Sequence, residues 1–184
     1  MNPAAEFALA RELRSGAGAR LGDVFSFVSG LYFRGKQTYA QAFGRGGEEE
    51  PGAFVISPGS GLRSLNERVS LERIADWASV SVDAENPRFT EPLIEDATTL
   101  DRVHGRDTRF VLLGSIATEK YVRPLTEIYG PRLLFPSEFV GRGDMSRGAL
   151  MLHAARAAQE LAYEPVLGAR RHGPRAPSFR APAR

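Results

Sequence analysis

Several short segments of this chain combine glycines, hydroxyl groups and charges in ways that suit the binding of an anion. The first is the run Ser57-Pro58-Gly59-Ser60-Gly61, which directly follows an apolar stretch at residues 53–56. Two glycines let backbone N–H groups approach a phosphate closely, and the two serines add hydroxyl donors. A tight turn that needs glycine for its backbone angles explains the same residues, so both interpretations stay open.

A second segment has Gly114 and Ser115 after the apolar run 110–113, with Thr118 close to the start of a helical pattern. Where a strand leads through a glycine into a helix, free N–H groups and the positive end of the helix dipole meet at one point. This order predicts a second anion-binding loop. The alternative is that Ser115 or Thr118 only caps its own helix.

The third segment, residues 141–148, holds Arg142, Asp144 and Arg147 among three glycines. The arginines can hold a phosphate or carboxylate through paired hydrogen bonds, and Asp144 is the candidate general base of a catalytic site. Asp144 can equally hold an arginine in place. A solvated loop without a ligand accounts for the whole segment as well.

The fourth segment places Arg34 and Lys36 among Tyr32, Phe33 and Tyr39. Aromatic rings interleaved with cations can stack on a base and neutralise a phosphate. Helical spacing explains the aromatic residues equally well as core positions. The three histidines of the chain lack the spacing of metal ligands, so we expect neither a metal site nor a cofactor.

The chain has 184 residues and no cysteine, and arginine outnumbers lysine by 22 to 2, a skew typical of a G+C-rich genome. Residues 168–184 carry five arginines and no acid, whereas residues 1–167 carry 19 basic groups against 22 acidic ones. The body therefore gives no electrostatic reason to bind nucleic acid, while the tail could bind it, or another acidic partner, weakly. No apolar run is long enough for a membrane span, so we expect a cytoplasmic protein without membrane contact.

The hydrophobic pattern predicts strands and helices that largely alternate. Strands are expected at residues 24–28, 53–56, 110–113, 133–135 and 163–167. Helices are expected at residues 7–13, 33–43, 71–78, 91–103, 117–129 and 149–161, with Ser70 and Thr90 as N-caps and a kink at Pro124. This pattern predicts the α/β class, as a single three-layer domain with a mostly parallel central sheet flanked by helices.

The predicted domain covers residues 1–167, and its first 20 residues contribute a peripheral N-terminal helix. Residues 44–52 are expected to form a solvated loop. Residues 168–184 are rich in arginine and proline and contain no aliphatic side chain larger than alanine. Such a segment cannot bury enough apolar surface to order itself, so we expect a disordered C-terminal tail. Composition does not indicate the oligomeric state.

Four segments can also be compared with a known family. They are Ser29-Gly30-Leu31-Tyr32-Phe33-Arg34-Gly35-Lys36 with Tyr39-Ala40, Phe54-Val55-Ile56-Ser57 with Gly61-Leu62, Val111-Leu112-Leu113-Gly114 with Tyr121 and Arg123-Pro124-Leu125, and residues 141–150. In this order they resemble bacterial proteins with a uracil-DNA-glycosylase-like α/β fold, including relatives of the YaaA peroxide-stress proteins. The resemblance implies a nucleotide, nucleoside or nucleic-acid ligand. It does not imply uracil excision, because the Gly-Gln-Asp-Pro-Tyr loop of uracil-DNA glycosylases is absent.

Three functional hypotheses follow. In the first, the chain is a hydrolase or transferase that acts on a glycosidic bond or a nucleotide, with Arg142 and Arg147 holding the anion and Asp144 activating water. In the second, the same pocket only recognises its ligand. In the third, the basic tail makes the chain an interaction protein. The first two require the glycine-rich loops to face one cavity at the carboxyl edge of the sheet.

Overall fold

Helices form most of the regular structure in the computed structural model, which describes residues 6–46 and 52–174. The α-helices of this part are α1 (Ala8–Arg14), α2 (Leu21–Phe43), α3 (Leu71–Ala78), α4 (Pro87–His104), α5 (Glu119–Tyr129) and α6 (Asp144–Arg156). Its strands are β1 (Ala19–Arg20), β2 (Phe54–Ser57), β3 (Gly61–Ser64), β4 (Arg68–Val69), β5 (Phe110–Val111), β6 (Leu133–Pro136) and β7 (Tyr163–Pro165). Two short 3-10 helices, Gly130–Arg132 and Ser137–Phe139, flank β6. The predicted mixture of helices and strands is confirmed.

The described strands form three small sheets. β1 pairs with β4, and β2 pairs with β3, both antiparallel, while β6 lies between β5 and β7. Among these pairs only β5 and β6 run parallel, with Phe110 opposite Leu133. A single three-layer domain around a mostly parallel sheet is therefore not confirmed. One physical reason is the turn after β2, which folds the chain back into a hairpin instead of leading it into a crossover helix.

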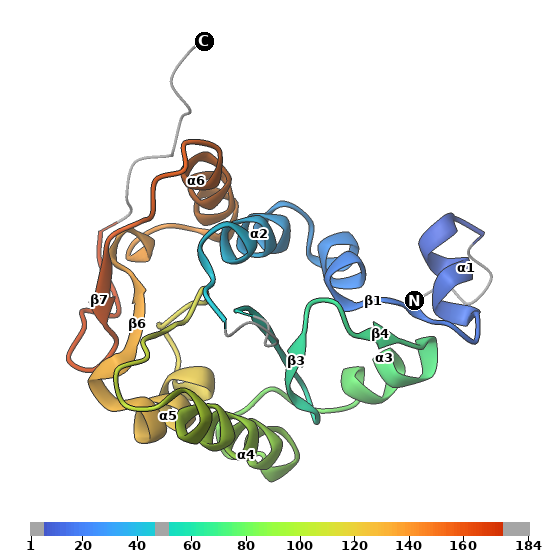
Figure 1. Cartoon of the computed structure of the whole chain (residues 1–184), viewed down its shortest axis with the longest axis horizontal. Coiled ribbons are helices and arrows are strands. Elements are labelled where there is room, and N and C mark those ends of the chain that lie inside the picture. The colour runs from blue at the N-terminus through green and yellow to red at the C-terminus, as the bar shows by residue number, and fades with distance from the viewer. Residues whose placement is uncertain (1–5, 47–51, 175–184) are drawn as a thin grey trace.

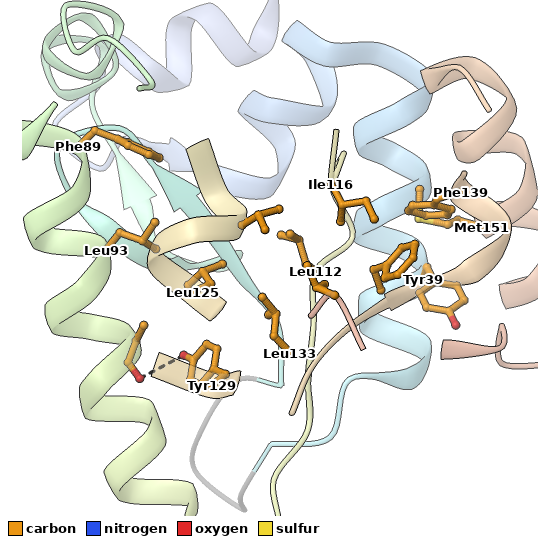
Figure 2. Close-up of a cluster of buried hydrophobic side chains, with 14 of the residues drawn as sticks. Tyr39, Phe89, Leu93, Leu112, Ile116, Leu125, Tyr129, Leu133, Phe139 and Met151 are labelled. Carbon is orange, nitrogen blue, oxygen red and sulfur yellow. Dashed lines mark hydrogen bonds between the residues drawn. The ribbon is translucent and has the colours of Figure 1, made fainter. Parts of the chain in front are cut away.

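Two pairs of helices lie on opposite sides of the main core. In Figure 1, α2 and α6 lie side by side, and α4 and α5 lie side by side opposite them; β6 and β7 lie along the left edge, and β1 and β4 lie at the right beside α1 and α3. Figure 2 shows how Tyr39 of α2, Leu93 of α4, Leu125 of α5 and Met151 of α6 fill the space between, all of them buried. The Tyr129 hydroxyl within this core donates to the Ala97 carbonyl at 3.1 Å, so α5 is also tied to α4 by a buried hydrogen bond.

A second, smaller core holds the N-terminal part of the chain. It contains Leu13 of α1, Val24 of α2 and Trp77 of α3, all less than a tenth exposed. The predicted helix near the N-terminus is confirmed as α1. The cap predicted for α3 is confirmed too, since the Ser70 side chain accepts a hydrogen bond from the Arg73 backbone N–H.

The strand predicted at residues 24–28 is wrong, because this segment belongs to α2. Val24 is buried, whereas Phe27 and Val28 are 61% and 64% exposed. The β-forming side chains thus have no sheet to join, and tertiary context overrides their propensity. Gly30 interrupts the helix with φ 61° and ψ −139°. These angles are open to glycine and few other residues, so glycine allows the chain to turn here.

Two helices begin earlier than predicted. α4 begins at Pro87, where the Asn86 side chain accepts a hydrogen bond from the Arg88 backbone N–H, so Asn86 rather than Thr90 is the cap. α6 begins at Asp144 with Gly143 at its N-cap, although a loop is predicted up to residue 148. Arg147 consequently lies in the first turn of a helix.

The first part of the predicted tail contacts the body of the protein. Ala169 packs against the main core, and the Arg171 guanidinium pairs with the Glu119 carboxylate. The rest of that tail, residues 175–184, lies outside the described residues, as do residues 47–51 of the predicted loop. None of the helices in residues 6–46 and 52–174 has the length and apolar character needed to cross a membrane.

Candidate functional site

The site is built on a close crossing of α2 and α6. A methyl group on Gly35 would lie 2.6 Å from the Gly148 carbonyl oxygen, and one on Gly148 would lie 2.9 Å from the Leu31 carbonyl oxygen. Side chains at these positions would therefore force the two backbones apart. The crossing brings Tyr32 and Lys36, which flank Gly35 on α2, next to the first turn of α6.

Lys36 is a partly buried amine in this crossing. Its Nζ atom lies 4.1 Å from the centre of the Tyr32 ring, in the geometry of a cation–π contact. Burial lowers the pKa of Lys36 to about 8; Arg147 and Lys120 act in the same direction through their charges, and Asp144 opposes them. The surroundings of Lys36 thus favour the neutral amine over the ammonium.

Tyr32 places a buried hydroxyl beside Arg147. Burial raises the pKa of Tyr32, and the Arg147 guanidinium offsets part of this increase through its charge and a side-chain hydrogen bond. That contact lies outside ordinary hydrogen-bond geometry, and the hydroxyl oxygen has no better-aligned hydrogen bond among the described residues. A ligand atom could supply a hydrogen bond of good geometry here.

Arg147 and Asp144 supply the α6 side of the site. The Arg147 side chain is only 13% exposed, and its Nε–H donates to the Phe139 carbonyl oxygen at 3.2 Å. Its Nη1 lies 3.4 Å from the Asp144 carboxylate, which is itself 67% exposed. Of the two roles predicted for Asp144, this ion pair favours holding an arginine in place over acting as a general base.

The N-terminal end of α5 forms the third side. Lys120 lies over the ring of its neighbour Tyr121, with Nζ 5.1 Å from the ring centre. Tyr121 is partly buried; burial raises its pKa, and it also contributes to the raised pKa of Tyr32. The six residues that share this location are Tyr32, Lys36, Lys120, Tyr121, Asp144 and Arg147, called the cationic cluster below.

A cavity of about 650 Å³ adjoins the cluster. Lys36 and Tyr121 line it together with Gly114, and most of its wall is made of apolar side chains such as Phe33 and Leu112. Small-molecule sites in proteins have a comparable size and a similar predominance of apolar walls with a few polar groups. The cluster therefore has space beside it for the uncharged part of a ligand.

The predicted loop Ser57-Pro58-Gly59-Ser60-Gly61 is the turn of the β2–β3 hairpin. Gly59 and Gly61 both have positive φ, 71° and 70°, so the turn itself accounts for the two glycines. The Ser60 hydroxyl accepts a hydrogen bond from Trp77 Nε1–H at 2.7 Å, whereas Ser57 is buried with its hydroxyl unpartnered among the described residues. The geometry thus favours a structural role for Gly59, Ser60 and Gly61.

In the predicted loop before α5, Gly114 adjoins the cavity, whereas Ser115 and Thr118 have local positions at the start of the helix. Gly114 is buried and lines the cavity beside the cluster. The Ser115 hydroxyl accepts a hydrogen bond from the Ala117 backbone N–H at 3.3 Å, which is a local turn contact. Thr118 is exposed and occupies the N-cap of α5, where its side chain makes no capping hydrogen bond.

Of the remaining predicted residues, Lys36 and Arg147 come together and Arg34 does not join them. Arg34 is exposed, and a spacing of two residues places it on the opposite side of α2 from Lys36. Arg142 uses its Nε–H to donate to the Glu138 carbonyl oxygen at 2.8 Å, so it braces the chain before α6.

Lys120 was not predicted as a site residue. Tyr32 was considered only as an aromatic ring that could stack on a base, and Tyr121 entered the sequence comparison without an assigned role. A signal was present, since Lys120 is one of only two lysines in the chain. Among residues 6–46 and 52–174, no three histidine, aspartate or glutamate side chains gather closely enough to hold a metal ion.

Comparisons with known proteins add no family assignment: no family model, no curated protein and no solved structure matches this chain. The resemblance to uracil-DNA-glycosylase-like proteins therefore stays a prediction.

Proposed function

We propose that this protein binds a phosphate-bearing small molecule, with nucleotides as the first class to test, at the cationic cluster. The observation that carries the proposal is the position of Lys36, whose Nζ lies 4.1 Å from the centre of the Tyr32 ring, with Arg147 and Lys120 near enough to act on it through their charges. These three cations come from different helices, and two of them lie in the first turns of α5 and α6, where helix dipoles also favour an anion.

The charge balance of the cluster supports an anionic ligand. Among the described residues, Asp144 is the carboxylate whose charge acts on Lys36, and its side chain is mostly exposed. Glu119, in the same turn as Lys120, is already paired with Arg171. A partly buried excess of positive charge is unfavourable without a counter-charge, and a phosphate would supply one.

The cavity supports a ligand larger than phosphate alone. Its apolar wall and the partly buried Tyr121 ring suit a planar, weakly polar group such as a nucleobase. A nucleotide carries both parts, a phosphate for the cluster and a base for the cavity. The absence of cysteine from the chain is compatible with a cytoplasmic location, which is part of this proposal.

Recognition rather than hydrolysis is the role that the geometry favours. The candidate base Asp144 is paired with Arg147 and faces solvent. A hydrolase needs a group that can accept a proton from water beside the ligand, and the other titratable groups that act on Lys36 are cations.

The proposal is tested by thermal unfolding with adenosine monophosphate, inorganic phosphate and adenosine as separate additives. Adenosine monophosphate at about 100 times its Kd should stabilise the protein by roughly 2.7 kcal/mol, and adenosine should stabilise it far less. Lys36→Met and Arg147→Met should each weaken binding of the nucleotide by about tenfold or more, the loss expected for a charge-assisted contact.

Arg34→Met is the matched control, because it removes one cation from the exposed side of the same helix. It should leave nucleotide affinity within about twofold of the wild type, since an exposed charge contributes little at that distance. If none of the phosphate compounds stabilises the protein, or if Arg34→Met weakens binding as much as Lys36→Met, the proposal is wrong.

A further inference from the structure

The two lysines of the chain lie in the same cluster. The chain has 24 basic residues, and all except Lys36 and Lys120 are arginine. Arginine serves as well as lysine wherever only a positive charge is required, and it binds phosphate at least as strongly. What arginine cannot supply is a primary amine that loses its proton near neutral pH. In a sequence so biased toward arginine, lysine at these two positions indicates a need for amine chemistry.

The surroundings of Lys36 suit an amine that reacts. Its Nζ atom lies over the Tyr32 ring, and among the described residues it has neither an ion pair nor a hydrogen bond. Its side chain also lines the cavity, so a ligand there can reach it. A lysine whose task is structural is usually held by a carboxylate.

We propose that Lys36 is a nucleophile that forms an imine with an aldehyde carried on a phosphorylated small molecule, an inference that rests on the phosphate binding proposed above. Arg147 and Lys120 bind the phosphate, and the cavity places the aldehyde carbon against Nζ. Open-chain sugar phosphates are the chemical class that combines the two groups.

The charges around Lys36 support this role. Tyr32 packs against it on α2. Lys120 of α5 and Asp144 and Arg147 of α6 act on it through their charges, and Tyr121 lines the same cavity. Burial and the two neighbouring cations lower the pKa of Lys36 to about 8. An ordinary lysine has a pKa near 10.4, so the neutral amine of Lys36 is roughly 200 times more abundant at pH 7.

The reaction is balanced without any further reagent. The nitrogen lone pair of neutral Lys36 attacks the carbonyl carbon, the C–N bond forms, and the carbonyl electron pair moves to oxygen. One proton then passes from nitrogen to that oxygen, which gives a carbinolamine. A second proton, from a neighbouring acid such as the Lys120 ammonium or from solvent, lets the oxygen leave as water while the nitrogen lone pair forms the C=N bond of a protonated imine.

The test uses pyridoxal 5′-phosphate as the probe, since it carries an aldehyde, a phosphate and an aromatic ring. The full-length protein is incubated with the probe, the imine is fixed with borohydride, and the labelled positions are mapped by peptide mass spectrometry. We expect Lys36 to be labelled at least about tenfold faster than Lys120 or the N-terminal amine, because phosphate bound at the cluster would hold the aldehyde beside the Lys36 Nζ atom. The rate should rise up to about pH 8 and then level off, and inorganic phosphate should slow it.

Two variants separate the amine from the charge. Lys36→Arg keeps the cation and removes the nucleophile, so it should lose the label and still bind adenosine monophosphate more tightly than Lys36→Met does. Arg34→Met, on the exposed side of α2, should retain labelling at Lys36, and circular dichroism checks that both variants are folded. Equal labelling of Lys36, Lys120 and the N-terminal amine would overturn the inference.

The same experiment distinguishes the two proposals. Stabilisation by adenosine monophosphate without selective labelling of Lys36 leaves phosphate binding intact and rejects the imine. Rapid labelling that neither phosphate nor adenosine monophosphate slows rejects phosphate binding at this cluster, and with it the inference.

Discussion

At the scale of single residues, the protein maintains an arrangement that favours binding over stability. The Lys36 ammonium and the Tyr32 hydroxyl lie partly buried beside the Arg147 guanidinium, and the hydroxyl has no hydrogen bond of ordinary geometry among the described residues. Burial of a charged amine and of a poorly bonded hydroxyl opposes folding. Groups whose protonation is perturbed in this way concentrate at functional sites.

The cost of holding charge at Lys36 can be measured through its pH dependence. The folded-state pKa of about 8 lies below the ordinary value of 10.5, so between these two values the unfolded chain binds more protons than the folded one. Stability therefore rises with pH across this window, and the full cost of the charge applies below about pH 8. Lys36→Met should be more stable than the wild type by on the order of 2 kcal/mol at pH 7, and this advantage should shrink toward pH 10.5.

Urea unfolding at pH 7, 8.5 and 10 measures the difference, and Arg34→Met, which removes an exposed cation, should show no such trend. The other groups that titrate at high pH, mainly tyrosines, are present in both proteins and largely cancel in the comparison. A constant difference between Lys36→Met and the wild type across this range would mean that the amine is not perturbed by folding.

At the scale of secondary-structure elements, the site depends on how closely two helices approach. Gly35 and Gly148 let the backbones of α2 and α6 touch, and this contact places Lys36 against the first turn of α6. The same two glycines lie in segments that the sequence comparison singled out. Their structural role is to permit close contact rather than to provide a turn, since neither has a positive φ.

Gly35→Ala tests this crossing. Alanine favours a helix over glycine by roughly 1 kcal/mol, so an isolated α2 would gain stability. The added methyl group would instead meet the Gly148 backbone at 2.6 Å, and we expect a net loss of about 1–3 kcal/mol together with weaker nucleotide binding. Chemical denaturation and calorimetric titration with adenosine monophosphate measure the two effects. Gly16→Ala, where a methyl group meets nothing within 4 Å, should change neither.

The sequence predicted the helices better than it predicted the sheets. It also predicted half of the residues of the cationic cluster. Ser70 could be predicted as a cap because capping depends on local chemistry. The segment 24–28 was predicted wrongly because its β-forming residues needed a partner strand that the fold does not provide. Lys36 and Arg147 could be proposed from their neighbours. For Lys120 the only signal was the rarity of lysine in the chain, since the fold alone brings it near Lys36.

In the molecule as a whole, the chain forms two hydrophobic cores and a peripheral C-terminal segment. The main core joins α2, α4, α5 and α6, and the smaller one holds α1 and α3. The cationic cluster lies where α2, α5 and α6 meet, so it belongs to the main core. Residues 168–174 cross from this core toward α5, where Arg171 meets Glu119 beside the cluster.

Truncation of the C-terminal segment at two places tests how far the folded body extends. Ending the chain after Leu167 removes the Ala169 packing and the Arg171–Glu119 pair, both of which are small contributions. We expect a loss of about 1 kcal/mol, since a largely exposed ion pair contributes at most about that much and alanine buries little area. Ending the chain after Pro174 keeps both contacts and should leave the free energy of unfolding unchanged.

Because Glu119 without Arg171 adds an unpaired carboxylate beside Lys120, the shorter chain should also bind adenosine monophosphate more weakly than the longer one. Equal stability and equal affinity of the two truncated chains would place the boundary of the folded body at residue 167, as the composition of the tail predicts.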